Sequence, residues 1–369
     1  MLVDAMKRLA ERLDKSVEEH EVGDPFFSNP SYKPFPISKE NFRHIESIQS
    51  DRRLAFVDGG NQEILGAPNF SVQFNRVYFC IFAQQQRVFE DKLPSPVEFL
   101  SLTHSTFKGG EIIYDTQLIP LEDDYKELLP KESDLSFNSF DRTVTVGTQR
   151  ADIERVASIA RRFAEWNYAF NVVEKRLNEG DVLVVDGTLQ TSFTNELKYV
   201  KKVYAAANSK GVIVTGISKT SRLFTTTGLS LLGAVRRVAE EAKIGGAWFI
   251  PIAEVQTSDH NAFIFVVKLN SIADHVFRFE INHEQFEQLG FKGVNEILSL
   301  LSDNSRDISF PGYPYGLVDA DRFARVAETE AETCKALLLS EISKIGKWPK
   351  LLGHIQAIDA HDVLNMLVG

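Results

Sequence analysis

Cysteine, positive charge and long apolar runs are all scarce in this chain of 369 residues. The two cysteines, Cys80 and Cys334, provide neither a disulfide framework nor the spacing of a zinc site. Lysine and arginine number 41 against 51 acidic residues, and the resulting net charge of −10 argues against a broad basic surface for nucleic acid. Any DNA contact must therefore be local or shared with a partner.

The chain also lacks an apolar stretch long enough to span a membrane. Its start, residues 1–19, is charged and helical in pattern, which is not typical of a secretory signal. We therefore expect no membrane association and a cytoplasmic location. The remaining composition, 43% hydrophobic and 25% charged, is that of a folded globular protein with one or two domains.

Two segments share one pattern, an apolar run followed by Asp-Gly, at Leu54–Gly60 and at Val182–Leu189. Each predicts a buried strand that ends at an aspartate, Asp58 or Asp186, and breaks at the following glycine. An ionised aspartate is costly in a buried strand, so two such strand ends indicate a shared polar partner, most simply a metal ion. The alternative is that each aspartate merely caps a turn, because Asp-Gly is a common turn dipeptide.

The hydrophobic pattern along the rest of the chain predicts a mixed α/β protein. Strands are expected at 53–58, 70–89, 110–119, 182–186, 212–217, 247–255, 261–269 and 275–281. Helices are expected at 2–20, 151–177, 195–208, 283–302, 319–344 and 360–367. Early strands that pair as a meander, followed by strands joined through helical crossovers, give the order of a ribonuclease H-like mixed sheet with flanking helices.

This order also suggests the domain limits. We expect a helical N-terminal extension at 1–50 that serves dimerisation, a ribonuclease H-like domain at 51–330 and a helical C-terminal extension at 331–369. In such a fold the first and fourth strands are central neighbours, which brings Asp58 and Asp186 together. The tips of neighbouring parallel strands lie about 5 Å apart, and carboxylates at that spacing suit Mg²⁺ or Mn²⁺. The sequence therefore predicts a metal-dependent phosphoryl-transfer site.

Glu165 is the only charged residue within 163–173 of the expected central helix. A helix that covers the sheet could direct this carboxylate toward the metal, and a solvated position at the helix edge is the alternative. Glu154 is its rival on the same helix, but the neighbouring Asp152 and Arg155 favour solvent exposure.

A local excess of positive charge interrupts the acidic chain between Glu196 and Arg237. Glu196 is the one acidic residue there, and the basic residues are Lys198, Lys201, Lys202, Lys210, Lys219, Arg222, Arg236 and Arg237. The run is a candidate track for DNA phosphates, and Lys219, at the end of a strand, is suited to hold one of them. For any single lysine a solvated helix face is the alternative.

Residues 310–321 are dense in turn formers and aromatic rings ahead of a long helix. One interpretation makes Asp319 the N-cap of that helix and Asp321 a favourable charge in its first turn. The functional interpretation places Tyr313 and Asp321 at the metal site.

Together these segments resemble the NurA family of prokaryotic DNA-end-processing nucleases. The matching segments span about residues 50–330 and are Phe56-Val57-Asp58-Gly59, Ala164-Glu165, Val185-Asp186-Gly187-Thr188-Leu189, Gly216-Ile217-Ser218-Lys219 and Gly312-Tyr313-Pro314-Tyr315. The resemblance implies a homodimer with a ribonuclease H-like fold that cleaves DNA with Mn²⁺ or Mg²⁺. It also implies 5′–3′ exonuclease and single-strand endonuclease activity in DNA end resection, together with a hexameric HerA-type ATPase.

By this resemblance Asp58, Glu165 and Asp186 are the metal carboxylates, and Tyr313 lies nearby. Members of the family often have a histidine eight residues after that tyrosine, where this chain has Asp321. Asp321 is therefore either a further metal ligand or a residue without a catalytic part.

The resulting interpretation is a DNA nuclease with two divalent ions about 4 Å apart, which activate water and stabilise the leaving oxygen. Lys219, Arg222, Lys201 and Lys202 are the candidate phosphate contacts. An actin-like phosphotransferase is disfavoured, because the sequence has no second glycine-rich loop and no duplicated domain. An inactive clamp or adaptor on the ATPase stays open, because the histidine is missing.

Overall fold

The computed structural model describes residues 1–18, 21–89, 93–346 and 353–354 of the chain. The helix expected at 360–367 lies outside the described residues. The chain divides into two compact units, each made of three separate segments. The first unit contains Met1–Arg52, Val184–Gln190 and Ile213–Tyr315, and the second contains Arg53–Leu183, Thr191–Val212 and Gly316–Gly369.

A meander of antiparallel strands forms the sheet of the second unit. In sheet order the strands are β4 (Arg53–Ala67), β5 (Phe70–Ala83), β7 (Val97–Lys108), β8 (Glu111–Pro120) and β9 (Ser136–Asn138), and β6 (Gln86–Val88) pairs with β5. Buried residues fill the first part of β4 and most of β5, which indicates that the centre of the sheet is covered on both faces.

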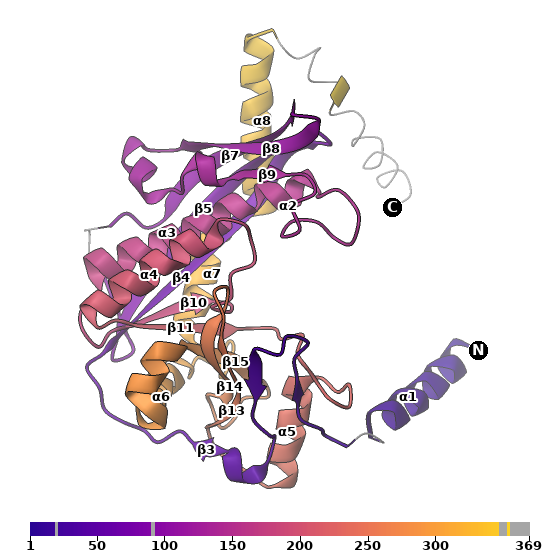
Figure 1. Ribbon diagram of the computed structural model, residues 1–369, viewed down its shortest axis with the longest axis vertical. Helices are drawn as coiled ribbons and strands as arrows, with labels where there is room; N and C mark the ends of the chain where they lie inside the picture. The colour runs from indigo at the N-terminus through magenta and orange to yellow at the C-terminus, as the bar shows by residue number, and fades with distance from the viewer. Residues whose placement is uncertain (19–20, 90–92, 347–352, 355–369) are drawn as a thin grey trace. The chain divides into compact units, whose positions relative to one another are not determined.

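Helices cover both faces of this sheet (Figure 1). They are α2 (Ile153–Ala157), α3 (Ile159–Arg176), α4 (Glu196–Lys210), α7 (Tyr315–Ala324) and α8 (Glu328–Lys344), with short 3-10 turns η2 (Asp123–Leu128) and η3 (Glu132–Asp134). On one face α3 packs beside α4, with the Phe163 and Tyr199 ring centroids 5.2 Å apart. On the other face α8 packs Ile342 against Leu65 and Phe70.

The first unit is built around a second run of antiparallel strands. Their order is β2 (Tyr32–Pro34), β13 (Trp248–Gln256), β14 (Asn261–Lys268), β15 (Phe277–Asn282) and β11 (Ile213–Ser218), and β3 (Arg43–His44) pairs with β13. Helix α6 (His283–Asn304) packs on these strands through aromatic rings, with the Phe263 and Phe286 centroids 3.8 Å apart. The other elements are α1 (Leu2–Glu18), η1 (Lys39–Asn41), α5 (Leu231–Glu241) and a two-stranded sheet of β1 (Pro25–Phe26) and β12 (Phe224–Thr225).

Strand β10 (Val182–Asp186) contributes residues to both units, and its neighbours in the sheet are β11 and β4. The prediction that the two Asp-Gly strands are neighbours is therefore confirmed. The predicted mixed α/β fold, with a large mixed sheet, flanking helices and helical segments before and after it, is confirmed as well. Across the described residues, none of the helices combines the length and apolarity that crossing a membrane requires.

Two long helices were predicted as single elements and are each divided. The helix expected at 151–177 is α2 followed by α3, with Ser158 between them. The helix expected at 319–344 begins earlier, at Tyr315, and is interrupted between Ala324 and Glu328. Strand β7 and helix α5 were not predicted, although Pro96 and Gly109 bound the first segment and Gly228 and Gly245 flank the second.

Candidate metal centre

Asp58 lies inside a strand, so the prediction that the strand ends at this aspartate was wrong. Strand β4 continues to Ala67 and stays paired with β5, with Asp58 opposite Tyr78. The side chain is buried, and its Oδ1 accepts a 2.7 Å hydrogen bond from the Gly59 N–H. A buried carboxylate in mid-strand is costly unless partners compensate its charge, which marks Asp58 as a candidate functional group.

The glycines that follow Asp58 allow close packing and do not form a turn. A Cβ atom at Gly59 would lie 2.6 Å from Oε1 of Glu165, and one at Gly60 would overlap the carbonyl oxygen of Ala324. Neither glycine has a positive φ angle. A side chain at Gly59 would therefore displace the Glu165 side chain, and one at Gly60 would push the end of α7 away from β4.

Asp186 is the last residue of β10, and here the predicted break is present. Gly187 has a φ of +118°, which residues with a side chain rarely adopt, and its N–H donates a 2.8 Å hydrogen bond to the Ile217 carbonyl. The Asp186 carboxylate pairs with Nζ of Lys219 at 2.9 Å and accepts a 3.3 Å hydrogen bond from the Tyr313 hydroxyl. Two groups thus orient this aspartate.

Tyr313 supports the Asp186 pair from a buried position. Its side chain is fully buried, and its ring stacks on Phe310 with centroids 5.2 Å apart. Nζ of Lys219 lies 5.6 Å from the centre of the Tyr313 ring, within the range of a cation–π contact. The tyrosine therefore contacts both members of the Asp186–Lys219 ion pair.

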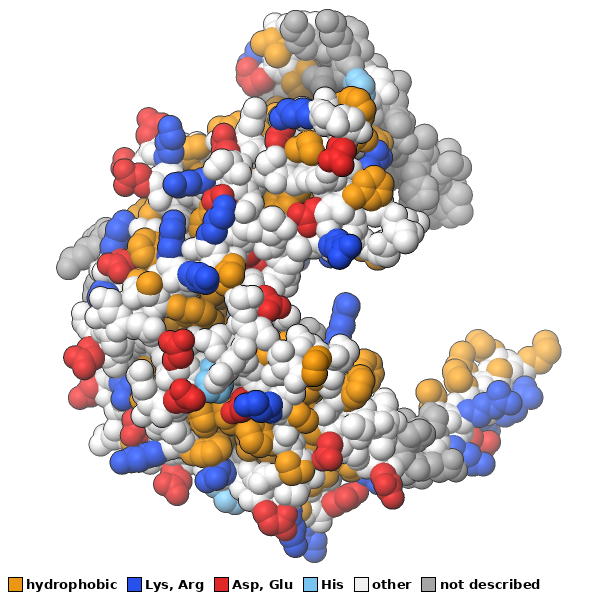
Figure 2. Space-filling view, viewed as in Figure 1, with side chains coloured by type: hydrophobic (Ala, Val, Ile, Leu, Met, Phe, Trp, Pro, Cys, Tyr) orange, Lys and Arg blue, Asp and Glu red, His pale blue; other side chains and the backbone are white. Residues whose placement is uncertain are grey.

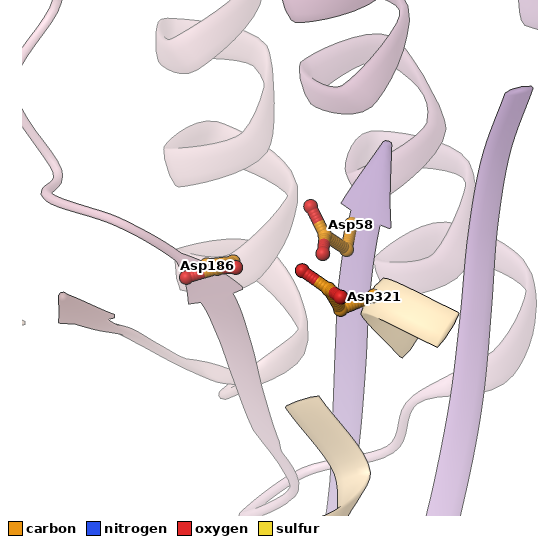
Figure 3. Close-up of side chains that lie close together, drawn as sticks. All are labelled: Asp58, Asp186 and Asp321. Carbon is orange, nitrogen blue, oxygen red and sulfur yellow. The ribbon is translucent and has the colours of Figure 1, made fainter. Parts of the chain in front are cut away.

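The structure brings Asp58, Asp186 and Asp321 together, as Figure 3 shows. One carboxylate oxygen from each residue lies within 4.8 Å of those from the other two. Asp321 belongs to α7. This helix lies so close to β4 that a side chain at Gly316 would overlap the Phe56 ring, and the glycine therefore permits the close approach. Asp58 is buried and Asp321 is exposed, so a ligand can reach the group from solvent.

The interpretation of Asp319 as an N-cap was wrong, because α7 begins at Tyr315 and both aspartates lie within the helix. Asp319 is buried and pairs with Nη1 of Arg87 at 3.0 Å. Its role is therefore to hold α7 on the sheet, whereas Asp321 belongs to the carboxylate group.

Glu165 is not part of the three-aspartate group. It is buried on α3, where Arg161 donates a short hydrogen bond to its Oε1 and Nη1 of Arg162 lies 3.6 Å from its Oε2. Arg161 also donates a 3.2 Å hydrogen bond to the Gly59 carbonyl. Glu165 and Arg161 therefore pack against the residue next to Asp58. Glu154, its rival, is exposed.

The expected basic run is divided among several local environments. Lys198 pairs with Asp134 at 2.7 Å, Lys210 donates to carbonyl groups of α3, and both arginines of α5 pair with glutamates of the same helix. Lys201 and Lys202 are exposed on α4 and Arg222 is exposed after β11, and none of these three forms an ion pair with any other described residue. Lys219 contacts the three-aspartate group through its ion pair with Asp186.

Sequence reasoning missed a buried polar network behind the Asp186 turn. Glu280 is fully buried, accepts a 2.8 Å hydrogen bond from the Leu189 N–H, and contacts Nε2 of His260 at 2.9 Å. Burial acts to raise the pKa of Glu280, but the nearby Arg278 and His260 lower it to about 2. These residues are far apart in sequence and follow no motif, so only the fold could reveal them.

A family model described as the NurA domain matches residues 52–326. The NurA nuclease from Sulfolobus solfataricus is 15% identical, with a TM-score of 0.54 over 94% of this chain and 96% of that one. Endonuclease V from Ciona intestinalis, in complex with a DNA containing an inosine followed by a ribo-adenosine, is 10% identical, with a TM-score of 0.36 over 75% of this chain and 86% of that one. No curated protein matches.

The Sulfolobus likeness extends over nearly the whole of both chains and shows a shared fold. The endonuclease V likeness is too low to bear on the fold. The family model covers most of the sequence, including all of β4, α3, β10 and α7 that carry the acidic residues described above. The chain therefore belongs to the NurA family.

Proposed function

We propose that this protein is a divalent-metal-dependent deoxyribonuclease that hydrolyses phosphodiester bonds at Asp58, Asp186 and Asp321. The observation that carries the proposal is the grouping of three carboxylate oxygens within 4.8 Å. Membership of the NurA family and the fold shared with a NurA nuclease support a DNA nuclease.

The donor set fits a hard divalent cation. All three side chains are carboxylates, which are the ligands that Mg²⁺ and Mn²⁺ prefer in proteins. Three carboxylates at this separation repel one another, and the ion pair between Lys219 and Asp186 offsets part of this repulsion. A bound cation relieves the remaining repulsion, and when bound it supplies a Lewis acid and a water of lowered pKa. The sequence-based interpretation has two such ions, and this number is part of the proposal.

The residues around the three carboxylates have separate tasks. The Gly59 N–H fixes the orientation of Asp58, and Tyr313 fixes that of Asp186. The side chain of Lys219 is 36% exposed, so its ammonium can hold a substrate phosphate while it faces Asp186. Asp321, on the exposed side, takes the place of the histidine that is frequent in the family and provides a third oxygen ligand.

Glu165 is proposed as an additional ligand, which requires its carboxylate to leave Arg161. Its burial beside Gly59 supports this role. Glu165→Ala should then reduce cleavage and the affinity for Mn²⁺ together, whereas Glu154→Ala, on an exposed residue of the neighbouring helix, should change neither. If Glu165→Ala lowers stability but leaves the Mn²⁺ affinity unchanged, Glu165 is only a partner of Arg161.

A homodimer that works with a hexameric HerA-type ATPase in DNA end resection is the finer part of the proposal. Helix α1 supports the homodimer, because apolar side chains line one side of this helix beside basic ones (Figure 2). Leu2, Met6, Leu9 and Leu13 are all more than half exposed, and burial across a twofold axis would remove this apolar surface from water. Deleting residues 1–20 should lower the molar mass measured by light scattering. An unchanged dimer would exclude α1 as its cause.

The decisive experiment incubates the purified protein with end-labelled DNA in Mn²⁺, Mg²⁺ or EDTA, alone and with the ATPase. We expect cleavage with a divalent ion, none with EDTA, and an ATP-dependent increase with the ATPase. Cleavage that persists in EDTA contradicts the metal site. A protein that binds DNA but never cleaves it, under all of these conditions, is instead a clamp or adaptor.

A further inference from the structure

An aromatic pocket opens in the first unit, outside the three-aspartate group. Its volume is about 350 Å³, and its rings come from Phe26, Phe27, Tyr32 and Phe224. Phe26 of β1 and Phe224 of β12 are directly opposite in the two-stranded sheet. The rings of Phe27 and Tyr32 stack with centroids 4.6 Å apart. The volume lies at the lower end of the range for small-ligand sites, about 300–1,000 Å³.

Two of the four rings of this pocket are exposed to solvent and do not complete a hydrophobic core. Phe26 is 54% exposed and Phe224 is 53% exposed. Leaving two large aromatic side chains half in water forfeits much of the free energy that their burial would provide. Their faces are therefore available as stacking surfaces.

The pocket also carries one positive charge and several polar groups. Arg222 lines it, is exposed, and forms no ion pair with any residue in the described part of the chain. Ser28, Asn29 and Gln190 line it as well and offer hydrogen-bond donors and acceptors. No acidic side chain is among its lining residues. A cationic, acid-free aromatic pocket is suited to an anionic ligand that has a flat ring.

A chain of part-buried and buried hydrogen bonds joins the pocket wall to the Asp186 turn within the same unit. The Tyr32 hydroxyl contacts Nδ1 of His260 at 2.7 Å, and Nε2 of His260 contacts Glu280 at 2.9 Å. Glu280 in turn accepts the 2.8 Å hydrogen bond from Leu189. The loop that follows Asp186 contributes Gln190 to the pocket, and the loop that contains Lys219 contributes Arg222. The pocket is therefore fixed relative to the Asp186–Lys219 pair.

We propose that the aromatic pocket binds an unpaired base of a DNA strand, with Arg222 on the adjoining phosphate. The inference rests on the proposed nuclease function and names its substrate class, a single-stranded segment. Aromatic faces together with a cation are how proteins bind single strands, because every base has a face that can stack. A paired base cannot enter the pocket, so the pocket selects single-stranded over double-stranded DNA.

The test measures equilibrium binding to the full-length chain by fluorescence anisotropy, in the inactive Asp58→Asn background with Mg²⁺ present. The probes are a labelled single-stranded oligonucleotide, the same strand with abasic sites, and a duplex. Phe224→Ala and Phe26→Ala should each weaken binding of the single strand about tenfold, the effect of one lost stacking contact. Phe224→Trp should restore it. Phe107→Ala, on another exposed phenylalanine, is the matched control and should change nothing.

The abasic strand and the duplex separate stacking from general damage to the fold. Phe224→Ala should not weaken binding of either probe, because neither offers an unpaired base. Equal losses on all three probes, or no loss on the single strand, would overturn the inference. A variant that instead changes the molar mass in light scattering would assign the pocket to a second copy of the chain and overturn it too.

The result is also distinguishable from a failure of the proposed function. If the unmodified protein cleaves DNA while the pocket variants bind like Phe107→Ala, the nuclease proposal stands and the pocket inference is wrong. If the single strand binds through the pocket but the unmodified protein never cleaves with Mn²⁺ or Mg²⁺, the pocket inference stands and the nuclease proposal is wrong.

Discussion

The two Asp-Gly segments have the same sequence pattern but different backbone structures. At Asp58 the strand continues to Ala67, and the following glycines make room for Glu165 and Ala324. At Asp186 the strand ends, and Gly187 adopts a φ of +118° with open space where its side chain would be. One glycine pair is required by packing, and the other glycine by its backbone angle.

This difference matters for the way each carboxylate is held. Asp58 is fixed by the sheet and by helices that press on β4, so its position depends on tertiary packing. Asp186 is fixed at a loop by Lys219 and Tyr313, so its position depends on a turn and two side-chain contacts. The two carboxylates of one site are thus positioned differently, Asp58 within a strand and Asp186 at a turn.

The largest expected effect is on DNA cleavage, when either Asp58 or Asp186 is replaced. Asp58→Ala and Asp186→Ala should each reduce DNA cleavage at least about a hundredfold, because losing a metal ligand removes several kcal/mol of transition-state stabilisation. Cleavage of end-labelled DNA and Mn²⁺ affinity by calorimetry measure the effect, and circular dichroism checks the fold. Near-normal cleavage by either variant would break the comparison, because only one of the two segments would then serve the site.

The next effect concerns the buried support of the Asp186 turn. Glu280→Gln leaves Arg278 buried without its partner charge, and breaking such a pair costs about 3–5 kcal/mol. The pKa of Glu280 is lowered from 4.5 to about 2, so its stabilising contribution is complete above pH 4.5 and is lost as the pH falls toward 2. The difference in unfolding free energy between the parent and the variant should therefore shrink over this pH range.

Urea unfolding at several pH values measures this difference. Glu284→Gln is the control, because Glu284 is exposed at the start of α6 and should contribute little at any pH. A difference that does not change with pH would mean that the carboxylate is not the source of the stability. It would also remove Glu280 as the support of the Leu189 loop.

A smaller effect on stability and on Mn²⁺ affinity distinguishes Gly60, which packing requires, from Gly187, which its backbone angle requires. Gly60→Ala should destabilise the protein by about 1–3 kcal/mol through overpacking against Ala324, and it should weaken Mn²⁺ binding because α7 carries Asp321. Gly187→Ala should cost a similar amount through backbone strain, on the order of 1–3 kcal/mol, without disturbing α7. Gly245→Ala is the control, because its surroundings are open and its φ is not positive.

Unfolding by urea and calorimetric titration with Mn²⁺ measure the two quantities for each variant. The expected pattern is a loss of stability in both Gly60→Ala and Gly187→Ala, with the larger loss of Mn²⁺ affinity in Gly60→Ala. Equal effects of Gly60→Ala and Gly245→Ala would show that the close packing at β4 is not required.

The fold and two of the three aspartates could be predicted from the sequence because each depends on local patterns. An apolar run that ends in Asp-Gly is visible within one segment, and the alternation of strands and helices sets the order of the sheet. The place of Asp321 stayed open between a charge in the first turn of a helix and a position at the metal site. It depends on where α7 begins, and that in turn depends on contact between Gly316 and the Phe56 ring, which are distant in sequence.

Glu165 shows the same limit of prediction from the sequence. Its isolation among apolar neighbours left a buried position and a solvated helix edge equally open, and the structure shows that Glu165 is buried. The pattern could not reveal that Arg161, one turn earlier, occupies its carboxylate and also donates to the Gly59 carbonyl. A charge that is buried in a helix predicts a partner, but the sequence does not distinguish a metal ion from an arginine.

The smallest expected effect lies on α4, away from both Asp-Gly segments. Lys201→Glu or Lys202→Glu should weaken DNA binding several-fold and reduce the salt dependence of log K by about one counterion, because one phosphate contact is lost. Lys126→Glu, on another exposed lysine without an ion pair among the described residues, is the matched control for the change in net charge. Anisotropy titrations over a range of salt concentrations measure both quantities. If the α4 variants behave like Lys126→Glu, the phosphates contact Lys219 and Arg222 instead, and DNA approaches the site along the loops of the Asp186 segment alone.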